Sequence, residues 1–186
     1  MKRRVIHTLL LALAVGACAT QPTALMPRTV EAVDLTRYLG LWHEVARLPQ
    51  RFQDNASLRC VAVTAEYAAR PDGRIAVTNG CDNALAPGEP RRVADGEAYV
   101  VEGSNNARLR VSFFRPFYGD YWVLGLDPEY RWALVGSPSR RSLWLLSRTP
   151  ELPPAELERA LDIARAAGFD LAPLIRAQRR MTPRPA

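Results

Sequence analysis

The sequence predicts an all-β fold followed by one helix, and three observations carry that prediction. Between residues 41 and 148, segments of strand length follow one another, and turn-forming residues separate them. Apolar and polar side chains alternate within several segments, as in residues 108–113, which is typical of a strand buried on one face. A single amphipathic helical pattern comes after the last segment. Short strands at this spacing indicate an all-β sandwich or barrel in one domain.

The N-terminus has the features of a targeting signal. A basic stretch at residues 2–4 precedes an apolar run over residues 5–15, small residues follow, and then comes Cys18. The run is too short to span a bilayer about 30 Å thick. The position of the cysteine resembles a bacterial lipobox, which predicts a signal peptide over residues 1–17 and Cys18 as the lipidated first residue of the mature protein. A plain secretory signal with an incidental cysteine is the alternative.

The residue after the lipidation site bears on location. Ala19 stands there instead of Asp, and resemblance to Gram-negative lipoproteins implies sorting to the outer membrane. Residues 18–33 are predicted to be a lipidated tether on the periplasmic side.

The charge balance gives no support for a nucleic-acid partner. The chain has 25 basic and 19 acidic residues, and loss of the basic residues at 2–4 leaves 22 against 19. The remaining arginines are scattered along the chain, so no basic patch of the kind that binds nucleic acid is expected.

The first element of the domain closes its base. Asp34 is expected to cap a short helical turn that ends at Leu39. Gly40 then permits a backbone conformation that other residues resist, and a strand over 41–48 begins. Trp42 is too large to leave in water, so it is predicted to point into the barrel as its floor, with Glu44 on the same face.

Turn residues divide the remainder of the β region. Pro71-Asp72-Gly73 is the strongest of these signals. With the first strand, the expected strands number eight, and they cover residues 41–48, 59–69, 74–81, 91–101, 107–114, 120–127, 131–137 and 142–148.

Cys60 and Cys81 flank the Pro71-Asp72-Gly73 turn. Two strands paired across that turn would bring the cysteines close together, apart from the shift in register that a bulge would introduce. The oxidising periplasm permits a disulfide, and two buried free thiols are the alternative.

The C-terminal part supplies the helix. Pro153-Pro154 opens it and Gly168 ends it, with apolar residues on one face that would pack on the outside of the barrel wall. Residues 169–178 are expected to return as a short strand or turn. Residues 179–186 are basic and Pro-rich and are predicted to be a flexible tail.

Four ordered blocks resemble the lipocalin family, in particular the bacterial outer-membrane lipocalins of the Blc type, with apolipoprotein D as a more distant relative. The resemblance covers roughly residues 34–178. It implies an eight-stranded antiparallel up-and-down barrel with one external C-terminal helix. It departs from the familiar Blc-type pattern at Cys60 and Cys81. The blocks are Gly40-Leu41-Trp42-His43-Glu44-Val45-Ala46-Arg47, residues 111–119, residues 121–127 with 130–135, and residues 143–150.

The resemblance also implies which residues close one end of the barrel and what kind of ligand binds inside it. Arg148 would lie over the ring of Trp42 beside Gly40 in a structural role. The family implies a small hydrophobic ligand, and strand alternation suggests its lining. The candidate ligand-binding residues are Ala46, Ile75, Val77, Ala98, Val111, Phe113, Tyr121, Val123, Val135, Trp144 and Leu146.

We therefore expect a carrier of fatty acids or lysophospholipids for storage or transport in membrane maintenance, anchored in the outer membrane. Its only expected partners are this ligand, the membrane and, as the resemblance to Blc-type lipocalins suggests, a second copy in a homodimer. His43 is the only histidine left after the signal is removed, so no metal site, catalytic triad or cofactor is expected. Two alternatives stay open. One is a lipocalin-fold enzyme acting on a hydrophobic substrate through a free thiol, and the other is an envelope interaction module.

Overall fold

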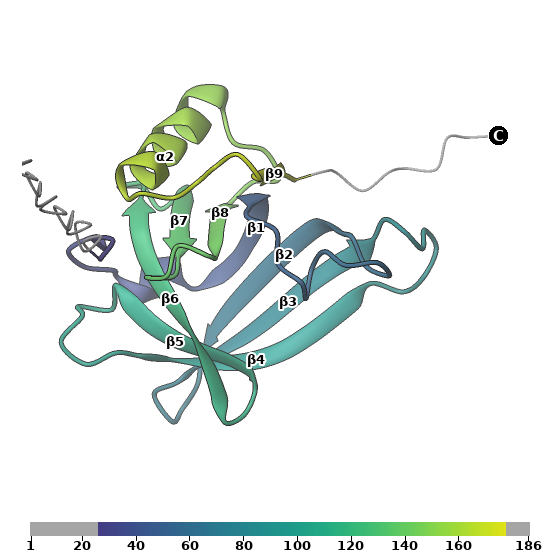
Figure 1. Cartoon of the computed structure of the whole chain (residues 1–186). Helices are drawn as coiled ribbons and strands as arrows, with labels where there is room; N and C mark the ends of the chain where they lie inside the picture. The colour runs from purple at the N-terminus through teal and green to yellow at the C-terminus, as the bar shows by residue number, and fades with distance from the viewer. Residues whose placement is uncertain (1–25, 178–186) are drawn as a thin grey trace, which may run out of the picture.

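A closed antiparallel β-barrel forms the body of the protein, as expected. The computed structural model describes residues 26–177 (Figure 1). Nine strands form one sheet in the order β2-β3-β4-β5-β6-β7-β8-β1-β9, and the additional pairing of β1 with β2 closes the barrel. The strands are β1 Gly40–Arg47, β2 Cys60–Ala69, β3 Ile75–Asn83, β4 Arg92–Val100, β5 Arg108–Phe114, β6 Phe117–Leu126, β7 Trp132–Gly136, β8 Leu143–Ser147 and β9 Ile175–Arg176.

Eight of these strands match the predicted ones, and their boundaries differ by at most two residues except at the start of β6. β6 begins at Phe117, not near residue 120, because Phe114 pairs with Phe117 across a tight turn. The pairing between β5 and β6 also shifts register between Val111 and Phe114. Irregularities of this kind bend strands and help a sheet to close into a barrel.

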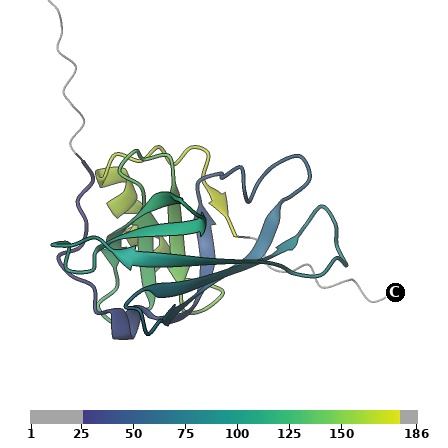
Figure 2. The ribbon, with the colours of Figure 1, turned by 90° about the horizontal axis from the view of Figure 1, so that it is seen from below.

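A short helix covers one end of the barrel. α1, Leu35–Tyr38, precedes β1, and the Asp34 carboxylate accepts a hydrogen bond from the Thr36 backbone N–H at 2.9 Å, as the predicted cap requires. Figure 2 shows α1 at this end and the second helix against the side of the barrel. Gly40 follows with φ +93°, a left-handed conformation that suits glycine.

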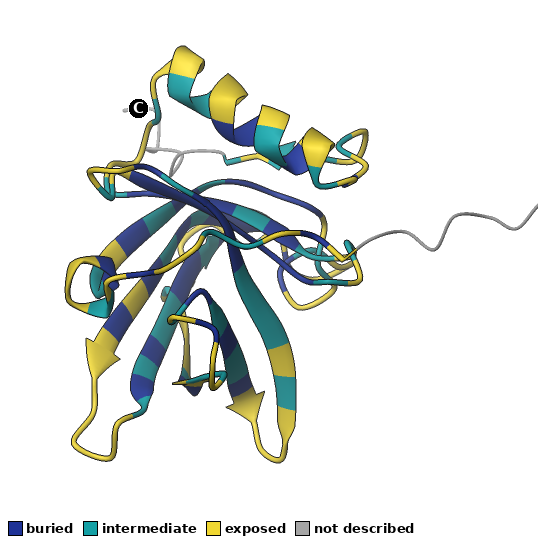
Figure 3. Cartoon of the chain, turned by 90° about the vertical axis from the view of Figure 1, so that its left-hand side faces the viewer, coloured by how far each residue is buried: buried dark blue, intermediate teal, exposed yellow. Residues whose placement is uncertain are grey.

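The second helix, α2 Pro154–Ala166, packs on the outside of the barrel wall. Ala160, Leu161 and Ala164 are its buried residues, and they face the sheet while the charged side faces water (Figure 3). Phe169, just beyond the helix, is buried with them, and Gly168 allows the chain to turn at φ +82°. We call the apolar cluster between α2 and the barrel the helix-side cluster. None of the helices within residues 26–177 is long and apolar enough to cross a membrane.

The segment that leads into α1 lies on the barrel. The Val30 backbone N–H donates to the Val123 carbonyl and that of Val33 to the Asn105 carbonyl, both at 2.9 Å. Val33 is buried. These contacts fall within the segment predicted as a tether. The predicted signal peptide over 1–17, Cys18 and the tail over 179–186 lie outside the described residues.

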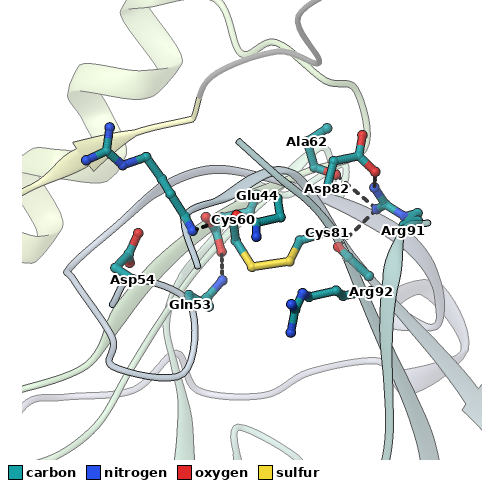
Figure 4. The surroundings of a disulfide bond; sticks show 12 residues. Glu44, Gln53, Asp54, Cys60, Ala62, Cys81, Asp82, Arg91 and Arg92 are labelled. Atoms are coloured by element: carbon teal, nitrogen blue, oxygen red, sulfur yellow. Dashed lines mark hydrogen bonds and ion pairs between the residues drawn. A yellow bond between two sulfur atoms is a disulfide. The ribbon is translucent and has the colours of Figure 1, made fainter. Parts of the chain in front are cut away.

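A disulfide between Cys60 and Cys81 joins β2 to β3, as predicted (Figure 4). The expected bulge is also present, because the register shifts between Val61 and Thr64, and Ala62 has φ +48°. Cys60 pairs with Asn83 in the strand register, its Cα lies 5.3 Å from that of Cys81, and the bond closes the hairpin far from its turn.

Candidate ligand-binding cavity

Trp42 and Arg148 plug the end of the barrel that α1 covers. The Trp42 side chain is fully buried, and its indole N–H donates to the Tyr38 carbonyl at 2.8 Å. The Arg148 guanidinium carbon lies 3.7 Å from the centroid of the Trp42 ring. Its nitrogens donate to the carbonyls of Arg37, Tyr38, Leu39 and Leu41 at 2.6–3.1 Å. One guanidinium therefore ties the backbone of α1 and the start of β1 to the end of β8, where Arg148 follows the strand.

A layer of tyrosines lies above this plug. The hydroxyl of Tyr121 shares hydrogen bonds with those of Tyr38 at 2.7 Å and Tyr67 at 3.0 Å. Burial raises the pKa of Tyr67 to about 12, and it raises the pKa of Tyr38 and of Tyr121 well above the ordinary value. The three hydroxyls are therefore neutral at ordinary pH, so the layer separates the plug from the cavity without adding charge.

The interior beyond the tyrosine layer is hollow. A cavity of about 460 Å³ lies there, within the range of small-molecule sites in proteins. Phe52, Phe113 and Arg141 line it and are exposed, so it opens to solvent at the end opposite Trp42. Six of the predicted lining residues do line it, namely Val77, Val111, Phe113, Tyr121, Trp144 and Leu146.

Four other predicted lining residues point inward but do not reach the cavity. They are buried in the apolar cluster that contains Trp42, at most 6 % exposed, and they fill the closed end. Alternation along a strand identifies the inward face, but it does not say at what depth the interior stops being filled. These residues are Ile75, Ala98, Val123 and Val135.

Ala46 requires a correction, because it faces away from the barrel interior. It is buried in the helix-side cluster. The register between β1 and β8 shifts between Glu44 and Ala46, so one extra residue of β1 is inserted there. A bulge of this kind reverses the alternation, which turns Ala46 outward and leaves Arg47 inside.

A charged network that the sequence did not indicate occupies the wall beside the mouth. Arg47, only 2 % exposed, donates to Glu44 at 2.5 Å and to both carboxylate oxygens of Asp54 at 2.5 and 2.8 Å. Gln53 donates to Glu44 at 2.9 Å and accepts from the Trp144 indole N–H at 3.0 Å. The network ties the loop over residues 48–59 to the barrel.

Burial and pairing act in opposite directions on these carboxyl groups. Burial raises the pKa of Glu44, and the charge of Arg47 offsets part of that rise. Burial also disfavours ionised Asp54, but the hydrogen bonds and the charge of Arg47, together with the Gln50 backbone N–H, outweigh it, and the pKa of Asp54 is lowered. Strict alternation would have placed Arg47 outside, so no pattern in the sequence could have revealed this network.

The described part of the chain holds no group of three or more His, Cys, Asp and Glu side chains arranged to bind a metal ion. Cys60 and Cys81 do not belong to the cavity lining.

The geometry defines a class of protein. An antiparallel barrel plugged at one end, with an apolar hollow open at the other and a helix outside, is a container for one small hydrophobic molecule.

The chain belongs to the lipocalin family, since the family model for the lipocalin-like domain matches residues 33–179. Outer membrane lipoprotein Blc of Vibrio cholerae is 40% identical over 95% of this chain and 99% of its own length. The Blc protein of Escherichia coli strain K12 is 42% identical over 87% of this chain and 88% of its own. Mouse apolipoprotein D is 31% identical over 84% and 79%.

Solved structures show the same fold at much lower identity. Insecticyanin from the tobacco hornworm has a TM-score of 0.62 and 17% identity, and the match covers 81% of this chain and 82% of that one. Lobster apocrustacyanin A1 has a TM-score of 0.60 and 13% identity, with coverage of 85% and 92%.

Proposed function

We propose that this protein is a lipid carrier that holds a fatty acid or a lysophospholipid in its barrel, for storage or transport in membrane maintenance. The observation that carries the proposal is the cavity of about 460 Å³, with apolar walls, a closed floor at Trp42 and a mouth open to solvent. An acyl chain placed there would gain about 25 cal/mol for each Å² of apolar surface removed from water.

The N-terminal features support a membrane-anchored carrier. Cys18 stands where a lipobox places the lipidated residue, and the relatives from Vibrio and Escherichia are named outer membrane lipoproteins. We place the protein on the periplasmic face of the outer membrane, held by the acylated cysteine. A homodimer stays a prediction, which sedimentation at several concentrations would test.

An enzyme that uses a free thiol finds little support. The sulfurs of Cys60 and Cys81 are joined to each other, and neither residue lines the cavity. A thiol nucleophile would first require reduction of the bond.

Native mass spectrometry of the protein purified without detergent tests the proposal. We expect a mass increase that corresponds to one single-chain lipid, and displacement of that lipid by added palmitate. Val111→Trp, which fills the cavity, should abolish the adduct. Val93→Trp is the matched control, because Val93 is 61% exposed and is not part of the lining. Equal lipid content in both variants would contradict binding inside the barrel.

A further inference from the structure

Most polar groups that face the cavity already have partners within the protein. The carboxylate of Glu44 accepts from Arg47 and Gln53, and that of Asp120 accepts from Arg110 at 2.9 Å. The Tyr67 and Tyr121 hydroxyls bond to each other. The Thr64 hydroxyl accepts from Arg91 at 2.7 Å. A ligand would have to compete with these contacts, so they are poor anchors for it.

Arg141 differs from these groups, because its guanidinium has no hydrogen bond or ion pair with any residue in the described range 26–177. It lies in the loop between β7 and β8 and contributes to the rim of the cavity. Its neighbour Arg140 has φ +60° and turns away, so that its Nε donates to the Ala167 carbonyl at 2.8 Å. The two adjacent arginines thus have separate roles, and the guanidinium of Arg141 stays available at the rim of the cavity.

Contacts within the protein hold the loop that carries Arg141. The same loop lines the cavity with Ser137, Ser139 and Ser142, and the hydroxyls of Ser137 and Ser139 bond to each other at 3.0 Å. The Gln50 amide donates to the Arg141 carbonyl at 3.1 Å, and Ser142 donates to the Gln50 side chain at 3.3 Å. These contacts hold the backbone of the loop against the loop over 48–59 and leave the guanidinium uncommitted.

Asn79 is the second residue of the lining that has an unpaired polar group, and this group is buried, whereas Arg141 is exposed. Its side-chain Oδ1 is buried, lines the cavity and has no hydrogen-bond partner among the described residues. It is on β3, opposite Ala65 of β2 and Ala94 of β4, neither of which can bond to it through a side chain. A buried acceptor left unpaired costs stability, so this oxygen is a place where a donor on a ligand gains a full hydrogen bond.

We propose that Arg141 and Asn79 select a single-chain lipid that carries both an anionic group and a free hydroxyl. The anion binds the guanidinium at the rim, the hydroxyl donates to Asn79 Oδ1, and the acyl chain fills the apolar part of the cavity. The inference rests on the proposed function and adds the polar chemistry of the ligand to it. A lysophospholipid and a hydroxy fatty acid share this chemistry, whereas a plain fatty acid lacks the hydroxyl.

Five ligands with an acyl chain of palmitoyl length distinguish the contact with Arg141 from the contact with Asn79. 1-Palmitoyl lysophosphatidic acid has a phosphate and a hydroxyl, and 3-hydroxyhexadecanoic acid has a carboxylate and a hydroxyl. Palmitic acid has only the anion, 1-monopalmitoylglycerol has only hydroxyls, and methyl palmitate has neither. Their affinities for the folded, delipidated protein are measured by displacement of a fluorescent acyl probe. We expect the two ligands with both groups to bind most tightly and methyl palmitate most weakly.

Two variants assign the contacts. Arg141→Gln should weaken binding of the three anionic ligands by about tenfold, the size expected for a charge-assisted hydrogen bond, and should leave the two neutral ligands unchanged. Asn79→Leu should weaken the three hydroxyl-bearing ligands by about threefold to tenfold and leave palmitic acid and methyl palmitate unchanged. Arg51→Gln is the matched control, since Arg51 is exposed on a mouth loop and is not in the lining.

The outcomes separate this inference from the proposed function. If all five ligands bind the unmodified protein equally, or if Arg141→Gln acts on neutral and anionic ligands alike, the inference is overturned while the lipid carrier stands. Equal loss with Arg51→Gln also overturns it, because the effect would then be general surface charge. If no ligand binds, including methyl palmitate, the proposed function fails and the inference fails with it.

Discussion

Replacing Arg148 with methionine tests the plug of the closed end. Methionine keeps an unbranched apolar stem of similar length, so the change removes mainly the guanidinium. That group makes four hydrogen bonds to carbonyl oxygens and stacks on Trp42. The bonds to Tyr38 and Leu39 are partly buried, and those to Arg37 and Leu41 are exposed.

The expected loss of stability follows from these contacts. Each partly buried bond to a charged donor contributes about 1.5 kcal/mol, and the exposed bonds contribute little because water replaces them. The cation–π contact adds about 1 kcal/mol. We therefore expect Arg148→Met to lower the free energy of unfolding by about 4 kcal/mol, and the midpoint of thermal unfolding by about 8–16 °C in a domain of this size.

Urea unfolding followed by tryptophan fluorescence measures this loss. Arg148→Lys is the matched control, because it keeps the charge but cannot reach several carbonyls at once, and its loss should be about half as large. Lipid affinity should stay unchanged in both variants below the unfolding transition, since Arg148 is not part of the cavity lining. A loss below about 1 kcal/mol for Arg148→Met would refute the view that this guanidinium holds the closed end together.

Three further predictions concern other parts of the barrel. Replacing Cys60 and Cys81 with serine should cost about 3 kcal/mol, because the bond closes a loop with a sequence separation of 21, and calorimetry with and without reductant checks this. Hydrogen bonds from Arg131 lower the pKa of the buried Asp127 carboxyl, so its contribution is present above the pKa of the unfolded state and is lost as pH falls through the folded pKa. Asp127→Asn should flatten this acid branch of the stability curve, and an unchanged slope would contradict it. Tyr121→Phe should cost about 1–2 kcal/mol by unpairing two buried hydroxyls, and ultraviolet titration should show Tyr67 un-ionised up to about pH 11 in the unmodified protein.

The parts of the fold predicted from sequence rest on local chemistry. The Pro71-Asp72-Gly73 turn, the Asp34 cap and the amphipathic face of α2 each depend on neighbouring residues. The disulfide also followed from local features, because a strong turn between Cys60 and Cys81 sets which strands pair. The start of β6 was missed, because the tight turn after Phe114 depends on how two strands meet.

The site was predicted less completely, and the reason lies in strand geometry. Alternation placed Val77, Val111 and Leu146 on the inner face, where they line the cavity. It failed at Ala46, because a bulge inserts one residue into β1 and reverses the parity that follows. A bulge arises from the pairing of distant strands, so the sequence of β1 alone does not contain it.

By itself, the sequence determined the class of fold, the position of Trp42 as a large residue that must be buried, and the order of the strands. Only the tertiary structure decided which inward side chains fill the closed end and which surround empty space, as the contrast between Val135 and Leu146 shows. It also decided which polar groups are paired within the protein, and so left the Arg141 guanidinium and the Asn79 Oδ1 without partners among the described residues. The physical reason is that the face toward which a side chain points follows from the alternation along its own strand. Cavity volume and hydrogen-bond pairing depend instead on how distant strands and loops close around one another.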